Sequence, residues 1–270
     1  MNNNLSGLSA IHIELTSRCN KNCHMCGRRK VEKTLPDLAD YSSDITLNLL
    51  KKISRQLPHN ILVILHWNGE PTLYPRLRSS LRLFNNQITT FNTNGKLLLA
   101  KSDDIINNLD TLVLSTFEDD PEWESQFKVF QKFLYKKGNK KPNTIIRCLG
   151  NISEERMELY KSTGSIIAKR ILHSPMGSFK YTNEPTIPEA GICLDFLNRV
   201  AINTKGEVSQ CVRFDSNRAG IIGDINIQSL SEIWNGEIRM NYLDKHIRGK
   251  RNEIPLCKEC EFWGVPRGGD

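Results

Sequence analysis

The sequence lacks any apolar run that could cross a bilayer, which takes ~20 residues. Its first residues also lack the basic start and apolar centre of a signal peptide. These absences exclude a membrane partner and lead us to expect a cytoplasmic protein. Neither a helix-turn-helix pattern nor interleaved aromatic residues accompany the net charge of +7, so nucleic acid is not an expected partner.

The positive charge is concentrated in short clusters. Lys and Arg total 37 against 30 Asp and Glu, and they gather at 28–30, 136–137, 140–141 and 245–251. The plainer interpretation is a solvated surface. A basic surface also attracts an anionic substrate or an acidic electron donor by long-range electrostatics.

Eight cysteines in a reducing compartment favour metal binding or catalysis over disulfides. Cys19, Cys23 and Cys26 follow an alternating apolar run at 11–15 that predicts a strand. Three thiols cannot pair among themselves. They can bind three irons of a 4Fe-4S cluster and leave the fourth without a protein ligand. A zinc site completed by His24 is the alternative.

The spacing Cys-x3-Cys-x2-Cys after a first strand resembles the signature of the radical S-adenosylmethionine (SAM) enzymes. In that family the amino and carboxylate groups of SAM chelate the open iron. An electron from the cluster then cleaves SAM and gives a 5′-deoxyadenosyl radical. Met25 stands where the family usually has an aromatic residue, and we expect its thioether to pack on the adenine.

Apolar runs and helical patterns alternate through the first two thirds of the chain. Six strands alternating with helices predict an α/β fold, a partial (β/α)6 TIM barrel of the open kind that this family uses. The expected strands are 11–15, 61–65, 88–92, 111–116, 144–149 and 165–172, and the expected helices are 46–57, 75–85, 96–109, 121–137 and 153–162.

Chemistry in such barrels sits at the carboxyl ends of the strands. The second strand ends in Asn68-Gly69-Glu70-Pro71, similar to the family's Gly-Gly-Glu-Pro with Asn68 in place of the first glycine. The resemblance implies that Gly69 and Glu70 hold the amino group of SAM. It also implies cofactor contacts from Asn94 after the third strand and from Ser115 on the fourth.

Alternation on the fifth strand places Arg147 on one face and Cys148 on the other. We expect Arg147 at the mouth of the barrel, where it would bind a carboxylate of the cofactor; a surface salt bridge is the alternative. Cys148 would then face the helices as a buried thiol.

A second cysteine set follows a break in composition at 175–188. A hairpin is expected at 200–211, and these residues with the terminal Cys-x2-Cys resemble the shortened SPASM region called twitch. The resemblance implies one auxiliary 4Fe-4S cluster, where a zinc site would be the alternative from spacing alone. We expect a barrel at 1–180 and a twitch domain at 181–270, with the cluster ligated by Cys193, Cys211, Cys257 and Cys260.

The resemblance predicts a dehydrogenase that acts on a small-molecule substrate, with two 4Fe-4S clusters, SAM, and a flavodoxin or ferredoxin as electron donor. The size and order of elements look closest to the aminocyclitol dehydrogenases of the subgroup. The auxiliary cluster would accept the second electron while a protein base removes the hydroxyl proton. By position, the candidates for catalytic roles are Arg170, His173 and Asp195.

Three alternatives stay open at this point. An epimerase would need a thiol as hydrogen donor, and Cys148 is the one cysteine outside the two sets. A peptide maturase is disfavoured because many begin with a leader-binding domain, whereas here the first strand is expected close to residue 1. A zinc protein that binds RNA is the alternative without enzymatic activity.

Overall fold

The computed structural model describes residues 4–170, 191–213, 215, 218–258 and 260. Within them, one nine-stranded sheet has the order β6-β5-β4-β3-β2-β1-β7-β8-β9. Neighbours from β1 to β6 pair in parallel, which confirms the predicted six-unit barrel. These strands are β1 (Ala10–Ile13), β2 (Leu62–Ile64), β3 (Ile88–Thr93), β4 (Thr111–Phe117), β5 (Asn143–Leu149) and β6 (Ile166–Arg170).

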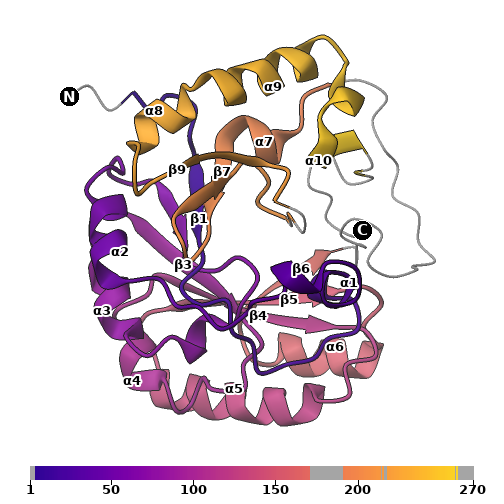
Figure 1. Ribbon diagram of the computed structural model, residues 1–270. Helices are drawn as coiled ribbons and strands as arrows, with labels where there is room; N and C mark the ends of the chain where they lie inside the picture. The colour runs from indigo at the N-terminus through magenta and orange to yellow at the C-terminus, as the bar shows by residue number, and fades with distance from the viewer. Residues whose placement is uncertain (1–3, 171–190, 214, 216–217, 259, 261–270) are drawn as a thin grey trace.

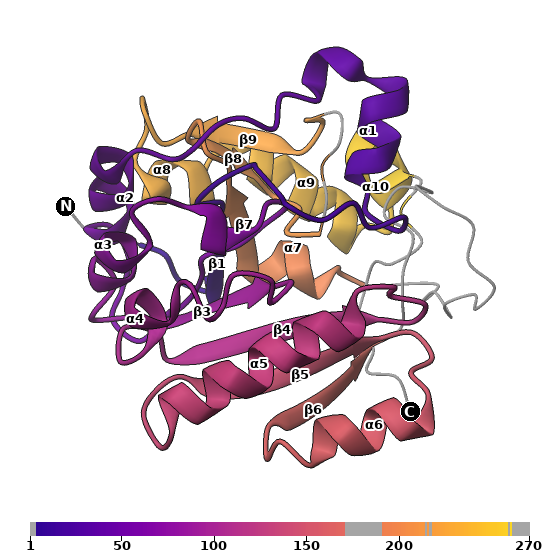
Figure 2. The same cartoon turned by 90° about the horizontal axis from the view of Figure 1, so that it is seen from below.

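Helices of the barrel half follow one another around the outside of these strands (Figure 1). They are α2 (Leu47–Ser54), α3 (Leu77–Arg82), α4 (Ser102–Ile105), α5 (Trp123–Lys137) and α6 (Glu154–Lys161). Figure 2 shows α5 and α6 covering β4 to β6 on the side away from the C-terminal elements. None of the helices in the described ranges combines the length and apolar character that crossing a membrane requires.

The alternation in β1 decides which side chains face the helices. Ile11, Ile13 and Leu15 are buried in the main core. His12 and Glu14 therefore point to the opposite face, the inside of the barrel. The same rule holds on β5, where Cys148 is 1 % exposed in the core, as predicted.

In the barrel half, one predicted helix is wrong in extent, and one helix was missed. The pattern at 96–109 gives only α4, because this stretch is a series of turns, several of them closed by bonds to the third residue back, and Asn107 adopts a positive φ of 63°. The missed helix is α1 (Arg28–Thr34), which follows the cysteine loop directly and carries an Arg29–Glu32 ion pair of 2.7 Å.

The C-terminal part continues the barrel sheet. β7 (Arg199–Ile202) pairs with β1 in parallel, and β8 (Glu207–Ser209) and β9 (Ile221–Asp224) follow antiparallel, so the predicted hairpin is confirmed. Gly206, at φ +96°, closes its turn. The remaining helices are α7 (Leu194–Asn198), α8 (Leu230–Trp234), α9 (Glu237–Ile247) and α10 (Pro255–Lys258). The predicted domain boundary at 180/181 lies outside the described residues.

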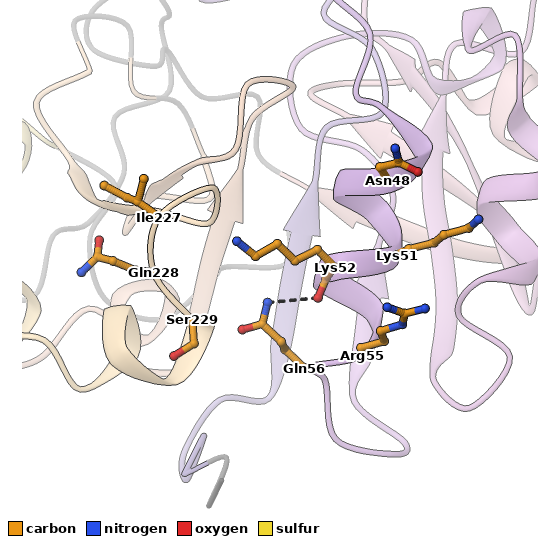
Figure 3. A pocket seen from close by; sticks show the side chains of 8 residues that line it. All are labelled: Asn48, Lys51, Lys52, Arg55, Gln56, Ile227, Gln228 and Ser229. Atoms are coloured by element: carbon orange, nitrogen blue, oxygen red, sulfur yellow. Dashed lines mark hydrogen bonds between the residues drawn. The ribbon is translucent and has the colours of Figure 1, made fainter.

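A surface groove marks the contact between the barrel and the C-terminal part. It lies between α2 and the turn that joins β9 to α8, and Lys51, Lys52 and Arg55 line one side of it (Figure 3). Lys52 Nζ crosses the groove to donate to the Asn226 carbonyl at 2.9 Å. The Leu230 N–H donates to Gln56 Oε1 at 2.6 Å, so polar bonds join the two parts here.

Candidate active site

The three N-terminal thiols lie on the loop between β1 and α1. All three are half-buried and free of disulfides. Burial raises the pKa of Cys23 to about 12, and the nearby Cys26 and Cys19 add to the rise. Burial also raises the pKa of Cys19, again with a contribution from Cys26. The thiols are therefore close enough to repel one another as thiolates, and binding iron would relieve that repulsion.

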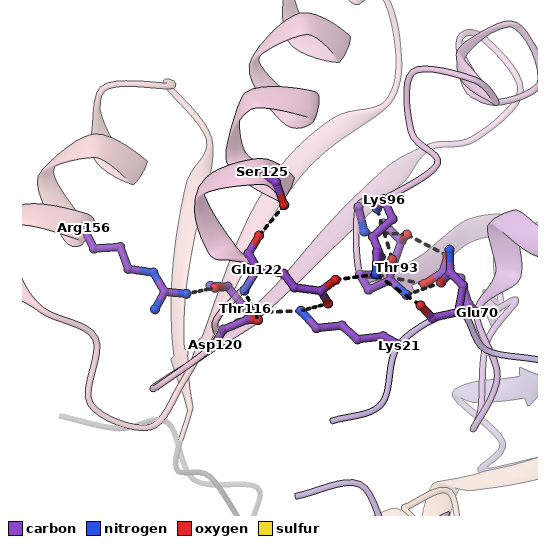
Figure 4. A network of polar contacts seen from close by, with 12 residues as sticks. Lys21, Glu70, Thr93, Lys96, Thr116, Asp120, Glu122, Ser125 and Arg156 are labelled. Atoms are coloured by element: carbon purple, nitrogen blue, oxygen red, sulfur yellow. Dashed lines mark hydrogen bonds and ion pairs between the residues drawn. The ribbon is translucent and has the colours of Figure 1, made fainter. Parts of the chain in front are cut away.

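A buried ion pair fixes the middle of this loop. Lys21 Nζ lies 2.6 Å from Asp120 Oδ2, and the two side chains are 4 % and 0 % exposed. Glu122 is 3.8 Å from the same ammonium group and pairs with Lys96 at 2.5 Å (Figure 4). Sequence reasoning missed this network. The signal was present, because a lysine between the thiols and an acidic run after β4 both lie at the carboxyl edge of the sheet.

The His24 side chain, which lies between Cys23 and Cys26 in the sequence, packs against the end of β4. His24 meets the Phe117 ring edge-on, with 5.8 Å between centroids. The Lys21 ammonium group also lies over the Phe117 ring, 4.9 Å from its centroid. The histidine that could have completed a zinc site thus packs on the end of β4. Across the described ranges no three His, Cys, Asp or Glu side chains are arranged to hold a single metal ion.

Gly69 and Glu70 press against the start of the cysteine loop. A Cβ on Gly69 would lie 1.9 Å from the Thr16 carbonyl oxygen, so only glycine fits there. The Glu70 N–H donates to the Arg18 carbonyl at 2.7 Å. This pair sets the position of the loop that carries the thiols.

The Glu70 carboxylate is buried and already holds several donors. Thr93 Oγ1 donates to Oε1 at 2.7 Å, the Asn94 N–H donates to Oε2 at 2.8 Å, and Thr72 donates from both its N–H and its hydroxyl. Burial nevertheless raises the pKa of Glu70. Asn94 also donates to Asn20 Oδ1 at 2.8 Å, which ties the third strand to the cysteine loop.

Ser115 and Arg147 are direct neighbours across β4 and β5. Burial lowers the pKa of Arg147 to about 10, with Arg170 as a second cause. The Arg147 charge in turn lowers the pKa of His12 and His66, both of which burial takes to about 3. Arg147 therefore faces the inside of the barrel, as predicted, and forms no ion pair with any described residue.

Glu14 follows β1 directly, and its carboxyl group is buried. From the sequence we expected no role for it beyond its place in the first strand. Burial raises its pKa to about 7, although the backbone of Asn68, Gly69 and Thr204 and the charge of Arg28 oppose the shift. The Asn68 N–H donates to Oε1 at 3.2 Å. Glu14 thus changes charge near neutral pH, beside the cysteine loop.

This shift predicts a pH-dependent stability difference between the protein and its Glu14→Gln variant. The unfolded chain loses the Glu14 proton near the ordinary value of 4.5, while the folded protein keeps it to about 7, so stability falls as pH rises between these values. Between about pH 5.5 and about pH 8.5 the variant should gain about 2 kcal/mol on the wild type. Urea unfolding at both pH values measures this, and an equal difference at both would contradict it.

The second cysteine set also comes together. Cys193, Cys211, Cys257 and Cys260 are all half-buried, and none of them forms a disulfide. Burial raises the pKa of Cys257, and the nearby Cys211, Cys260 and Cys193 raise it further. Arg251 donates to the carbonyls of Cys257 and Cys260, which fixes the terminal turn. Four thiols gathered in this way suit a fully ligated cluster.

The three predicted catalytic residues have different environments. Arg170 ends β6, where its carbonyl accepts from the Gly150 N–H at 2.9 Å. Asp195 is buried in α7 and pairs with Arg213 at 2.8 Å and Arg199 at 3.5 Å. His173 lies outside the described residues. Catalytic roles for these residues stay predictions, and Met25, half-buried on the cysteine loop, stays a predicted adenine contact.

Comparison with known proteins agrees with this geometry. Residues 193–261 match the family model SPASM, an iron-sulfur cluster-binding domain. The structure of BtrN in complex with AdoMet and 2-DOIA has a TM-score of 0.62 at 16 % identity, over 97 % of this chain and 98 % of that one. SuiB of Streptococcus suis bound to precursor peptide SuiA gives 0.66 at 13 %, over 95 % and 72 %. AdoMet-bound anSMEcpe gives 0.63 at 12 %, over 93 % and 90 %. No curated protein matches in sequence.

These similarities confirm the resemblance that the cysteine spacing indicated. The chain has the fold of the radical SAM enzymes. Its C-terminal part matches the SPASM iron-sulfur cluster-binding domain, at residues 193–261.

Proposed function

We propose that the protein is a radical SAM dehydrogenase that oxidises a hydroxyl-bearing small molecule. The observation that supports this most strongly is the pair of thiol sets, three on the loop after β1 and four in the C-terminal part. A set of three leaves one iron of a 4Fe-4S cluster open, whereas a set of four leaves none. Such a pairing suits one centre that binds a cofactor and another that only carries electrons.

The residues present fit both groups. Cys19, Cys23 and Cys26 would hold the first cluster, which with SAM supplies the 5′-deoxyadenosyl radical for hydrogen-atom abstraction. Cys193, Cys211, Cys257 and Cys260 would hold the auxiliary cluster, which supplies an acceptor for the second electron. A flavodoxin or ferredoxin would be the donor, since the net charge of +7 favours an acidic partner.

The chain itself orients these groups. Lys21 and Gly69 fix the cysteine loop from two sides. The half-buried Arg147 cation, next to Ser115, would offer a charge-assisted contact to the SAM carboxylate. The donors on Glu70 hold its carboxylate ready beside Asn94 for the SAM amino group.

Anaerobic purification tests the proposal. We expect about eight irons, with matching sulfide, per chain. Incubation with SAM, a reductant and candidate alcohols should give one carbonyl product for each 5′-deoxyadenosine. Zinc without sulfide would exclude the function altogether. Formation of a product with inverted configuration, or of a modified peptide, would replace dehydrogenation with one of the two alternatives.

Replacement of Cys148 separates dehydrogenation from epimerisation. The thiol is buried in the core on the helix side of β5, and burial raises its pKa to about 11. It therefore faces away from Arg147 and the inside of the barrel. Cys148→Ala should leave turnover within about twofold of the wild type. The substitution removes a buried core thiol, so it should lower the stability of the fold without changing the groups that react. Continued SAM cleavage with loss of product would favour the epimerase.

A further inference from the structure

The pairing of β5 with β6 brings two arginines onto one face of the sheet. Arg147 lies opposite Ala168, and Arg170 lies opposite Leu149, two residues further along both strands. Paired residues of parallel strands share a face, so Arg170 points to the inside of the barrel, as Arg147 does. The helices α5 and α6 cover the other face (Figure 2). The two Cα atoms are about 8 Å apart from strand geometry, and the charge of Arg170 accordingly contributes to the lowered pKa of Arg147.

The register of β4 to β6 places Arg170 level with the cysteine loop. Phe117 pairs with Leu149, which pairs with Arg170, so the three form one row at the carboxyl edge of the sheet. At the β4 end of this row, the Phe117 ring contacts His24 on the cysteine loop. The row before it contains Arg147, to which we assign a SAM contact. Arg170 therefore lies at the end of the barrel where SAM would bind.

Both arginines lack a counter-ion. Each side chain is half-buried, and neither forms an ion pair within the part of the chain that the structure describes. Arg199 of β7, by contrast, has Asp195 at 3.5 Å. Glu118 follows β4, but its carboxylate accepts from the Asn151 N–H at 2.5 Å and pairs with neither arginine. Since charges removed from water are normally paired in proteins, this surplus of positive charge calls for anions from outside the chain.

SAM can supply only one of these anions. It has a single carboxylate, which we assign to Arg147, and its ammonium and sulfonium groups are positive. Two histidines inside the barrel add no charge, because burial lowers the pKa of both His12 and His66 to about 3, with a further contribution from Arg147. With SAM in place, Arg170 is the cation that still needs an anion.

We propose that Arg170 binds an oxyanion of the substrate, so that the substrate is a small hydroxylated molecule with a phosphate or carboxylate group. The planar guanidinium group matches either oxyanion with two parallel N–H donors. The position of Arg170, one row beyond Arg147, holds the substrate next to the SAM carboxylate and thus inside the barrel mouth. The inference rests on the proposed function, because it names the substrate class of that enzyme.

Three matched compounds test this by calorimetry on the reconstituted, SAM-loaded protein. Glycerol 3-phosphate, glycerate and glycerol share a hydroxylated three-carbon chain and carry a phosphate, a carboxylate and no charge. At least one of the two acids should bind with a Kd of about 1 mM or tighter, and roughly tenfold or more tightly than glycerol. The acid that binds more tightly identifies the oxyanion.

Two neighbouring residues of β6 provide the variant and its matched control. Arg170→Gln should weaken binding of the preferred acid roughly tenfold or more, and Arg170→Lys, which keeps the charge, should weaken it less. Lys169→Gln removes the same charge from the next residue. Lys169 is exposed and pairs with Cys148, on the helix side of the sheet, so this variant should bind within about twofold of the wild type. General attraction to a basic surface would lower both variants equally.

Several results would overturn the proposal. They are equal binding of the three compounds, no binding of either acid at roughly 10 mM, or equal losses in Arg170→Gln and Lys169→Gln. Tighter binding of the peptide Gly-Gly-Asp-Gly-Gly than of both acids would refute the small-molecule part. Iron and sulfide content and SAM cleavage without substrate are measured on the same wild-type samples. If they persist while the acids fail, only the substrate class is wrong; if they are absent, the enzyme class is wrong.

Discussion

Cys23→Ala is expected to leave no 5′-deoxyadenosine above background, while the auxiliary cluster persists. The loop after β1 offers three thiols, and two ligands do not retain a cubane cluster with an open iron. Iron should fall from about eight to about four per chain. Metal and sulfide analysis with chromatographic detection of 5′-deoxyadenosine measures both effects.

The matched control for this variant is Cys257→Ala in the second set. It should also lose about four irons, but SAM cleavage without substrate should continue, since the first loop is untouched. Formation of the carbonyl product should fall to background because the second electron has no acceptor. SAM cleavage by Cys23→Ala, or its loss in Cys257→Ala with all remaining iron still bound, would contradict the assignment of the two thiol sets.

Gly69→Ala is expected to have the largest effect of any change that removes no ligand. The new Cβ would lie 1.9 Å from the Thr16 carbonyl oxygen and 2.9 Å from that of Arg18, and both are backbone atoms. The cysteine loop must therefore move, which should cost about 3 kcal/mol or more of unfolding free energy. SAM affinity should fall with it, because Glu70 N–H loses its bond to Arg18.

Gly164→Ala is the control for the steric clash that Gly69→Ala introduces. Gly164 has a φ of +71° and nothing within 4 Å of an added Cβ, so it tests backbone strain alone. A loss of about 1 kcal/mol is expected there. Denaturant unfolding of both variants, with SAM binding by calorimetry, gives the two numbers. Equal losses in the two variants would mean that the contact at Gly69 does not set the loop.

The sequence predicted the parts of this protein that depend on local pattern. The six barrel strands, the helices α2, α5 and α6, and both cysteine sets follow from periodicity and spacing. The helix at 96–109 failed because turns at Gly95 and Asn107 override its apolar spacing. Lys21 with Asp120, and Glu14 with Thr204, join residues far apart in the chain, so their burial could not be seen before the fold.

The parallel pairing of β7 with β1 means that the C-terminal part covers one edge of the barrel sheet. In the described sheet, β1 has β2 on one side and β7 on the other, so both of its edges are paired with a strand. A fragment cut before Arg199 would present β1 as a bare edge strand, the kind that recruits strands from other chains. We therefore expect the barrel fragment to aggregate when it is expressed without the C-terminal part.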